Sequence, residues 1–164
     1  MSTTQSTSPK RAQITFPTDT EMVITRHFSA PRELVWRAYT EAEHVREWFG
    51  CDMMEMTEVT SDVRPGGRYR YVGRDDQMEH PFSGEYLDVE APERLVSTET
   101  YENVPGSEHR CELTLEEVDG GTLLTERLTY PSKEARDGHV DSGMEHGVQQ
   151  SYDGIEQIAQ RLAA

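Results

Sequence analysis

Hydrophobic residues near the end of the chain recur with a helical period. Five of them follow one another at steps of four, three, four and three: Val148, Tyr152, Ile155, Ala159 and Leu162. This spacing places the apolar side chains on one face of a helix over residues 141–162. An amphipathic helix buries its apolar face, so we expect it to lie on a sheet formed by the preceding chain. A solid core without any binding site would satisfy the same spacing.

Most of the preceding chain alternates between apolar and polar residues with the two-residue period of strands. Residues 21–28 alternate imperfectly, because Arg26 falls on the apolar side. Between residues 57 and 130, short alternating segments are separated by turn signals, among them Pro65-Gly66-Gly67 and Asp119-Gly120. These segments predict about seven strands joined by antiparallel hairpins.

Two short helices are expected between the first strand and the second. Ser29 can cap the first helix and Pro31 suits its first turn. Thr40 can cap the second helix, which ends before Gly50. Helices and strands do not alternate as βαβ units, so we predict an α+β fold with a bent antiparallel sheet. A single domain over residues 21–164 would follow a flexible arm over residues 1–20.

Composition narrows the classes of partner. The 164-residue chain carries 31 acidic and 16 basic residues, a formal net charge of -15. Such a surface repels phosphate backbones and anionic lipids, so we expect neither nucleic acid nor membrane partners. No apolar run resembles a signal peptide or spans a bilayer, which predicts a cytoplasmic protein. Cys51 and Cys111 would then be reduced, buried thiols.

Candidate chemistry is sparse. His139 and His146 are seven residues apart, too far to bind one ion from a single helix. The sequence has neither a glycine-rich phosphate cradle before a helix nor a nucleophile elbow. We therefore predict no catalytic residues, no cofactor and no metal site.

Aromatic residues and methionines are concentrated on the faces expected to point inward. A buried tyrosine hydroxyl needs a hydrogen-bond partner, so several inward tyrosines suit a wet or ligand-filled cavity better than a solid core. The predicted ligand-binding residues are Trp36, Trp48, Phe49, Tyr69, Tyr71, Phe82, Tyr86, Tyr101, Glu126, Met144, Val148 and Tyr152.

Glu126 is the unusual member of this set. It shares its strand parity with Leu124 and Leu128, which predicts that its carboxyl points inward. An isolated carboxylate among aliphatic residues is costly, so it would raise its pKa, pair with Arg26, or contact water or ligand in a cavity. A bulge that turns Glu126 toward solvent is the alternative.

Several short segments resemble the bacterial proteins similar to the activator of heat-shock protein 90 ATPase. The matching segments are Ile24-Thr25-Arg26-His27-Phe28-Ser29-Ala30-Pro31-Arg32-Glu33-Leu34-Val35-Trp36, followed by Thr40, Glu43-His44 and Trp48, and then Val63-Arg64-Pro65-Gly66-Gly67, Ser83-Gly84-Glu85-Tyr86, Pro92-Glu93-Arg94-Leu95, Gly121-Thr122-Leu123-Leu124 and Met144-Glu145-His146-Gly147. The resemblance implies the helix-grip fold of START domains and polyketide cyclases. In that fold, a seven-stranded bent sheet grips the C-terminal helix and a cavity lies between them.

Three functions are compatible with this reading. The first is a non-catalytic binding protein for a small apolar or aromatic ligand. The second, implied by the resemblance alone, is a module that binds a chaperone, regulates its ATPase and serves the stress response. The third is a cyclase or hydrolase that uses a buried acid or base in the same cavity. Strand edges would also permit a homodimer.

Overall fold

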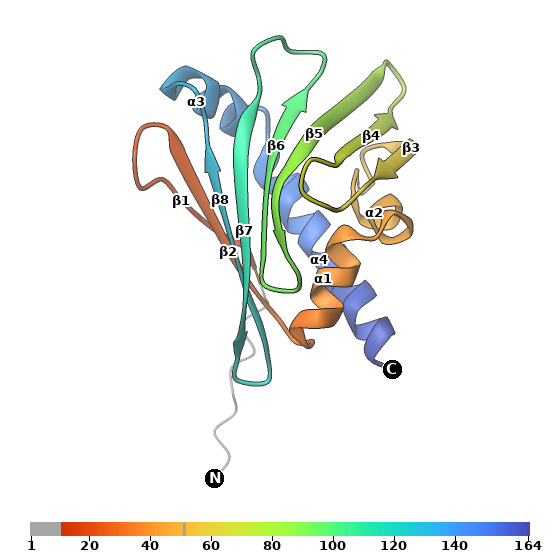
Figure 1. Cartoon of the computed structure of the whole chain (residues 1–164). Coiled ribbons are helices and arrows are strands. Elements are labelled where there is room, and N and C mark those ends of the chain that lie inside the picture. Colours follow the sequence, from red (N-terminus) through yellow and green to blue (C-terminus); the bar gives the residue numbers. More distant parts are fainter. Residues whose placement is uncertain (1–10, 51) are drawn as a thin grey trace.

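A single curved sheet covered on one face by helices forms the protein (Figure 1). The computed structural model describes residues 11–50 and 52–164. All neighbouring strands are antiparallel, in the spatial order β1-β2-β8-β7-β6-β5-β4-β3. The strands are β1 (Gln13–Thr15), β2 (Glu21–Phe28), β3 (Glu55–Ser61), β4 (Arg68–Arg74), β5 (Glu79–Glu90), β6 (Arg94–Tyr101), β7 (His109–Val118) and β8 (Gly121–Thr129).

The described sheet has eight strands, so the predicted number of seven is wrong by one. The additional strand is β1, which lies in the segment expected to be a flexible arm. Ile14 pairs with Ile24 of β2, and the backbone of Ala12 exchanges two hydrogen bonds with the side-chain amide of Gln149. A three-residue edge strand has too few positions to show a period, which is why the pattern missed it. Residues 1–10 of the arm lie outside the described residues.

Four helices are described. They are α1 (Arg32–Thr40), α2 (Ala42–Trp48), α3 (Lys133–Asp141) and α4 (Met144–Ala163). The expected caps of the first two helices are wrong: Pro31 and Glu41 occupy the N-cap positions, and neither caps through its side chain. The Thr40 hydroxyl instead donates to the Trp36 carbonyl within α1, at 2.7 Å.

The C-terminal helix is shorter at its start than predicted. Gly143 has a φ of 84°, a left-handed conformation that side chains with a Cβ rarely adopt, and it separates α3 from α4. The Ser132 hydroxyl caps α3 by accepting a hydrogen bond from the Ala135 amide at 3.0 Å. The predicted apolar stripe lies on α4, where Tyr152, Ile155 and Ala159 are buried.

Aliphatic side chains fill the interior at the β2, β7 and β8 end of the sheet. The inward positions of these strands include Met22, Ile24, Leu113, Leu115 and Leu124, each at most 2 % exposed. Their alternation with outward polar residues is the two-residue period of a sheet with one buried face. This end therefore forms the solid part of the core.

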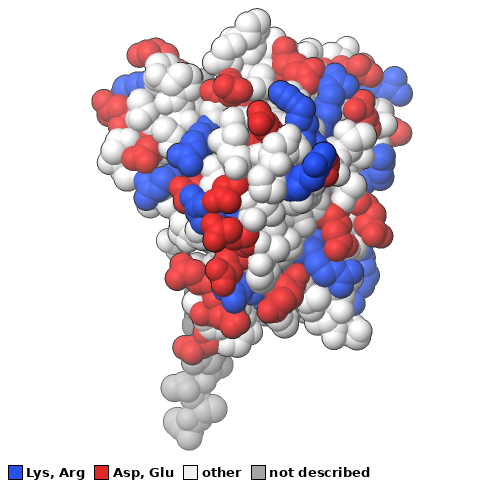
Figure 2. Space-filling model, viewed as in Figure 1, with Lys and Arg blue, Asp and Glu red and all other residues white. Residues whose placement is uncertain are grey.

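The outer surface is acidic but interspersed with arginine. Figure 2 shows both signs over the visible face. Arg94 pairs with Asp88, Glu90 and Glu112, and Arg70 pairs with Glu58 and Glu102. Among the described residues, no helix is both long and apolar enough to cross a membrane.

Candidate functional site

A cavity of about 60 Å³ lies between the first two helices and the sheet. Its lining comes from α1, α2 and five strands, so segments distant in sequence converge on it. The lining residues are Tyr39, Thr40, Trp48, Phe49, Tyr69, Tyr71, Tyr86, Leu95, Ser97, Glu99, Cys111 and Glu126.

Strand parity explains why these side chains meet. Tyr69 and Tyr71 are two residues apart on β4 and therefore share its inner face. Leu95, Ser97 and Glu99 share the inner face of β6 in the same way. Each short strand thus contributes alternate residues to one enclosed space.

Aromatic rings form the walls of the cavity. The ring centroids of Tyr69 and Tyr71 are 4.8 Å apart, those of Tyr69 and Tyr86 are 5.3 Å apart, and those of Phe49 and Tyr71 are 5.1 Å apart. On the helical side, the Tyr39 and Trp48 rings lie 5.4 Å apart. These separations are typical of favourable aromatic pairs, so the walls support one another.

The polar tips of the wall residues have hydrogen-bond partners. The Tyr69 hydroxyl donates to the Thr98 carbonyl at 2.8 Å, and the Tyr86 hydroxyl lies 2.7 Å from the Ser61 hydroxyl. The Trp48 indole N–H donates to the Ala38 carbonyl at 2.8 Å. Because buried polar groups without partners are costly, these bonds fix the rings in place.

Glu126 presents its carboxyl to the cavity from β8. Its Oε1 accepts a hydrogen bond from the Tyr152 hydroxyl at 2.6 Å, and its Oε2 accepts one from the Tyr39 hydroxyl at 3.3 Å. Burial raises the pKa of Glu126, and the nearby Glu99 adds to the rise, although the two tyrosine hydrogen bonds act against it. The considered pairing with Arg26 does not occur, because Arg26 binds Asp153 at 3.0 Å.

A second carboxyl, Glu99, lies against an imidazole. Glu99 Oε1 is 3.2 Å from His109 Nε2. Burial acts to raise the pKa of Glu99, but the adjacent His109 outweighs it and the pKa is lowered. For His109, burial acts to lower the pKa, yet Glu99 raises it overall. Burial, together with Glu99 and Glu126, raises the pKa of the Cys111 thiol well above its usual range.

Six of the twelve predicted ligand-binding residues line this cavity. These six are Trp48, Phe49, Tyr69, Tyr71, Tyr86 and Glu126. Tyr152 reaches it indirectly, through its hydrogen bond to Glu126.

The other five predicted residues are not among the lining residues. Trp36 is buried in the core, and Met144 and Val148 pack against that core from α4. Phe82 stacks on Tyr101 at 4.9 Å, beyond the Phe49 side of the cavity.

Several lining residues were missed although the sequence carried their signal. Glu99 has the same strand parity as Leu95 and Tyr101, which were both expected to share one face. Cys111 was placed on the inward side of its strand, but its neighbourhood depends on the pairing between strands. The helical period predicts Tyr39 on the apolar side of the first helix but does not indicate where its hydroxyl points.

A larger and more open groove of about 500 Å³ lies mainly on the opposite face of the sheet. Its lining includes Arg68, Arg70, Ser83 and Glu85, which have the outward parity on β4 and β5. Arg70 is neutralised there by ion pairs with Glu58 and Glu102 at 3.0 Å. A ligand in such a shallow polar groove would remain largely in contact with water. The enclosed aromatic cavity is therefore the stronger candidate for a ligand-binding site.

The curved antiparallel sheet, the long C-terminal helix and the cavity beneath the helices define a helix-grip domain of the ligand-binding type. The family model described as Activator of Hsp90 ATPase homolog 1-like protein matches residues 29–160. The chain belongs to this family.

Solved structures agree with the fold. A protein from Rhodobacter sphaeroides is 28% identical, with a TM-score of 0.85 over 93% of this chain and 99% of that one. Protein Ms6760 from Mycobacterium smegmatis is 26% identical, with a TM-score of 0.80 over 94% of this chain and 99% of that one. No curated protein compared with the chain matches it. The cytoplasmic location, the homodimer and the chaperone partner stay predictions.

Proposed function

We propose that this protein binds a small aromatic molecule carrying a hydrogen-bond donor, without transforming it. The observation that supports this most is a carboxyl, Glu126, at the floor of a cavity whose walls are aromatic rings. Ring faces favour a flat aromatic ligand, and a desolvated acceptor favours one that carries a hydroxyl or amino group.

The volume of the cavity limits the size of the ligand. A space of about 60 Å³ is smaller than the cavity of about 150 Å³ that is known to bind benzene, so a single ring enters only if a wall residue such as Phe49 or Trp48 moves aside. A ligand with two or three rings would need a larger displacement of the same wall. We therefore assign single-ring compounds, such as phenols and anilines, as the preferred class.

The hydrogen bonds at the floor favour recognition of a donor. Each carboxyl oxygen of Glu126 accepts one tyrosine hydroxyl and can accept a further hydrogen bond. A ligand hydroxyl or amino group could take that position, whereas a ligand carboxylate would meet both Glu126 and Glu99 and be repelled. Neutral or cationic single-ring donors are thus preferred over aromatic acids.

One observation favours a second candidate, an enzyme that uses Glu126 as a general acid or base. Burial raises the pKa of Glu126, as acid and base catalysts require. Replacement by glutamine separates the two functions. If the protein only binds its ligand, Glu126→Gln should weaken binding and abolish no reaction. If the protein is an enzyme, Glu126→Gln should abolish turnover of an identified substrate while the substrate still binds.

Native mass spectrometry of the freshly purified protein, followed by a ligand-observed NMR screen of single-ring aromatics, tests the proposal. Both are performed with a chelator present. Ser97→Val replaces a hydroxyl by a methyl group and adds a second methyl group inside the aromatic cavity, and Ser83→Val makes the same change in the outer groove. The two variants therefore form a matched pair.

We expect phenols and anilines to bind, Ser97→Val to weaken them about tenfold or more, and Ser83→Val to leave them unchanged. Binding that survives Ser97→Val but is lost in Ser83→Val would move the site to the outer groove. A screen in which no single-ring compound binds would overturn the proposal.

A further inference from the structure

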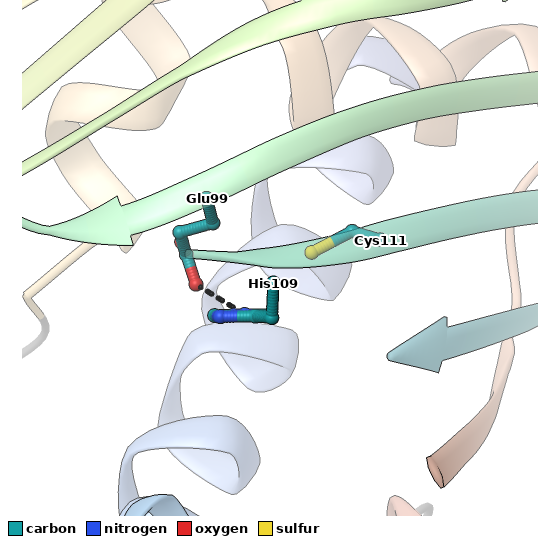
Figure 3. A group of neighbouring side chains, drawn as sticks. All are labelled: Glu99, His109 and Cys111. Atoms are coloured by element: carbon teal, nitrogen blue, oxygen red, sulfur yellow. Dashed lines mark ion pairs between the residues drawn. The ribbon is translucent and has the colours of Figure 1, made fainter. Parts of the chain in front are cut away.

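Three potential metal ligands meet on the inner face of β6 and β7. Glu99 is directly opposite His109 in the register of the two strands, and Cys111 follows His109 by two residues on the same face of β7. Figure 3 shows the three side chains gathered between the strands and the helix behind them. Their ligand atoms all lie within 4.8 Å of one another.

The His109 ring is fixed in the orientation that a metal ligand requires. Its Nδ1 is 3.1 Å from the Ser107 carbonyl, which can only accept, so Nδ1 carries the hydrogen. The ring also stacks on Tyr130, with centroids 4.7 Å apart. A backbone carbonyl on one ring nitrogen commonly orients the other nitrogen of a metal-binding histidine.

The remaining nitrogen, Nε2, is buried and has no hydrogen-bond partner among the described residues. His109 is only 8 % exposed. The Glu99 carboxylate lies 3.2 Å from Nε2, within ion-pair distance, but without the geometry of a hydrogen bond. A buried nitrogen facing both a carboxylate and a thiol is an arrangement that a shared cation would satisfy.

We propose that Glu99, His109 and Cys111 bind a Zn²⁺ ion. Ligand atoms around tetrahedral zinc are about 3.3–3.7 Å apart, given zinc bonds of about 2.0–2.3 Å. The Glu99 to His109 contact is already at this distance, and the thiol, within 4.8 Å of the other two ligand atoms, must approach by no more than about 1.5 Å. A rotation of the cysteine side chain and a small shift of the glutamate can supply that movement.

The kinds of ligand select the metal. A thiolate combined with an imidazole suits zinc, whereas calcium and magnesium prefer oxygen ligands alone. Glu99 and Cys111 also line the aromatic cavity, so a fourth position would face that space and be open to water. Three protein ligands and one open position are the pattern of zinc sites that bind exchangeable molecules.

A second group, Glu41, Glu43 and His44, also brings three potential ligand atoms together. In this group His44 is buried, Glu41 is half-buried and Glu43 is exposed; it contains no thiol, and its Glu41 carboxylate is bound by Arg37 at 3.0 Å. We propose no metal site there. The group provides a control variant, because a metal ion bound by these residues would have no thiolate ligand.

Cobalt absorption tests the site directly. Cys51 lies outside the described residues, so Cys51→Ser serves as the reference protein, with Cys111 as its only thiol. Co²⁺ is titrated into the full-length reference, and Zn²⁺ affinity is measured by competition with a chromophoric chelator. Cys111→Ser, His109→Gln and the control Glu43→Gln are made in the same background, with folding checked by circular dichroism.

We expect one equivalent of Co²⁺ to give a thiolate charge-transfer band that Zn²⁺ abolishes. Cys111→Ser should lose the band, and both ligand variants should weaken Zn²⁺ binding by about 100-fold or more. Glu43→Gln should change neither. If a ligand variant does not fold, the Co²⁺ titration of the Cys51→Ser reference protein still tests the proposal. A spectrum of that protein at saturating Co²⁺ without the thiolate charge-transfer band would overturn it. Loss of the charge-transfer band or of Zn²⁺ affinity in Glu43→Gln would also overturn the proposal.

Discussion

The two ends of the protein interior are equally enclosed but differ in chemistry. At the β2, β7 and β8 end, most inward positions are aliphatic, among them Met22, Ile24, Leu113, Leu115 and Leu124, and these side chains pack in the core. At the β4, β5 and β6 end, the same inward positions carry Tyr69, Tyr71, Tyr86 and Ser97, and a cavity remains. Strand parity therefore largely determines which side chains point inward, whereas the size and chemistry of those side chains distinguish the packed end from the end with the cavity.

Glu126 lies at the boundary between the two ends. Its strand neighbours at the same parity are Leu124 and Leu128, whereas its carboxyl faces Tyr39 and Tyr152. Burying a carboxyl there is costly and contributes little to packing. Under the proposed function, the aliphatic end stabilises the fold and the aromatic end binds the ligand, and the following predictions test this division.

The largest effect is expected at the aliphatic end. Leu124→Ala removes a side chain that is fully buried on β8 and should lower the free energy of unfolding by about 2–5 kcal/mol. Leu87→Ala makes the same change at a residue that is 45% exposed, and should stay within about 0.5 kcal/mol. Urea unfolding measures both variants, and equal losses would contradict the assignment of a solid core to this end.

A smaller loss is expected at the boundary. Tyr152→Phe removes the 2.6 Å hydrogen bond to the Glu126 carboxyl and should cost about 1.5–3 kcal/mol. Tyr101→Phe is the matched control, because its hydroxyl bonds to His80 and Asn103 near the surface, where water can replace it. It should cost about 1 kcal/mol or less. A larger loss for Tyr101→Phe in urea unfolding would refute the ranking.

The pH dependence of stability should report Glu126. Burial raises the pKa of Glu126 above its ordinary value of 4.5, so the folded protein binds this proton more tightly than the unfolded chain. The resulting stabilisation is complete below pH 4.5 and is lost as the pH rises through the folded-state pKa. Relative to Glu126→Gln, the unmodified protein should therefore become less stable as the pH increases.

Urea unfolding at several pH values, with a chelator present, measures this difference. A constant difference between the two proteins across the series would mean that the carboxyl has the same pKa in the folded and unfolded states. Glu79→Gln, at an exposed position of β5, controls for the general effect of removing one acidic residue.

Much of the fold could be predicted from the sequence, because period and turn chemistry are local properties. The apolar stripe of α4, the hairpin turns and the inward parity of Glu126 all follow from residues close together in the chain. The strand β1 could not be predicted, since Gln13–Thr15 is too short to show a period and depends on its partner β2.

The site was harder to predict because it depends on the pairing between strands. His109 and Cys111 share a face by their own spacing, but only the register places Glu99 opposite His109. The register shift between Tyr86 and Asp88 in β5 has the same consequence, since it changes which residues of that strand meet β6. Phe82 and Tyr101 pair with each other outside this shift; their parity predicts both in the cavity, but they stack beside it.

The central claim is that the aromatic cavity recognises a ring through a hydrogen bond to Glu126. Phenol and toluene have nearly the same shape and differ in one donor, so their dissociation constants, measured by NMR titration, isolate that bond. A hydrogen bond to the carboxyl corresponds to a preference for phenol of about 10- to 100-fold, and Glu126→Gln should reduce that preference. Equal affinities of the unmodified protein for phenol and toluene would contradict the account.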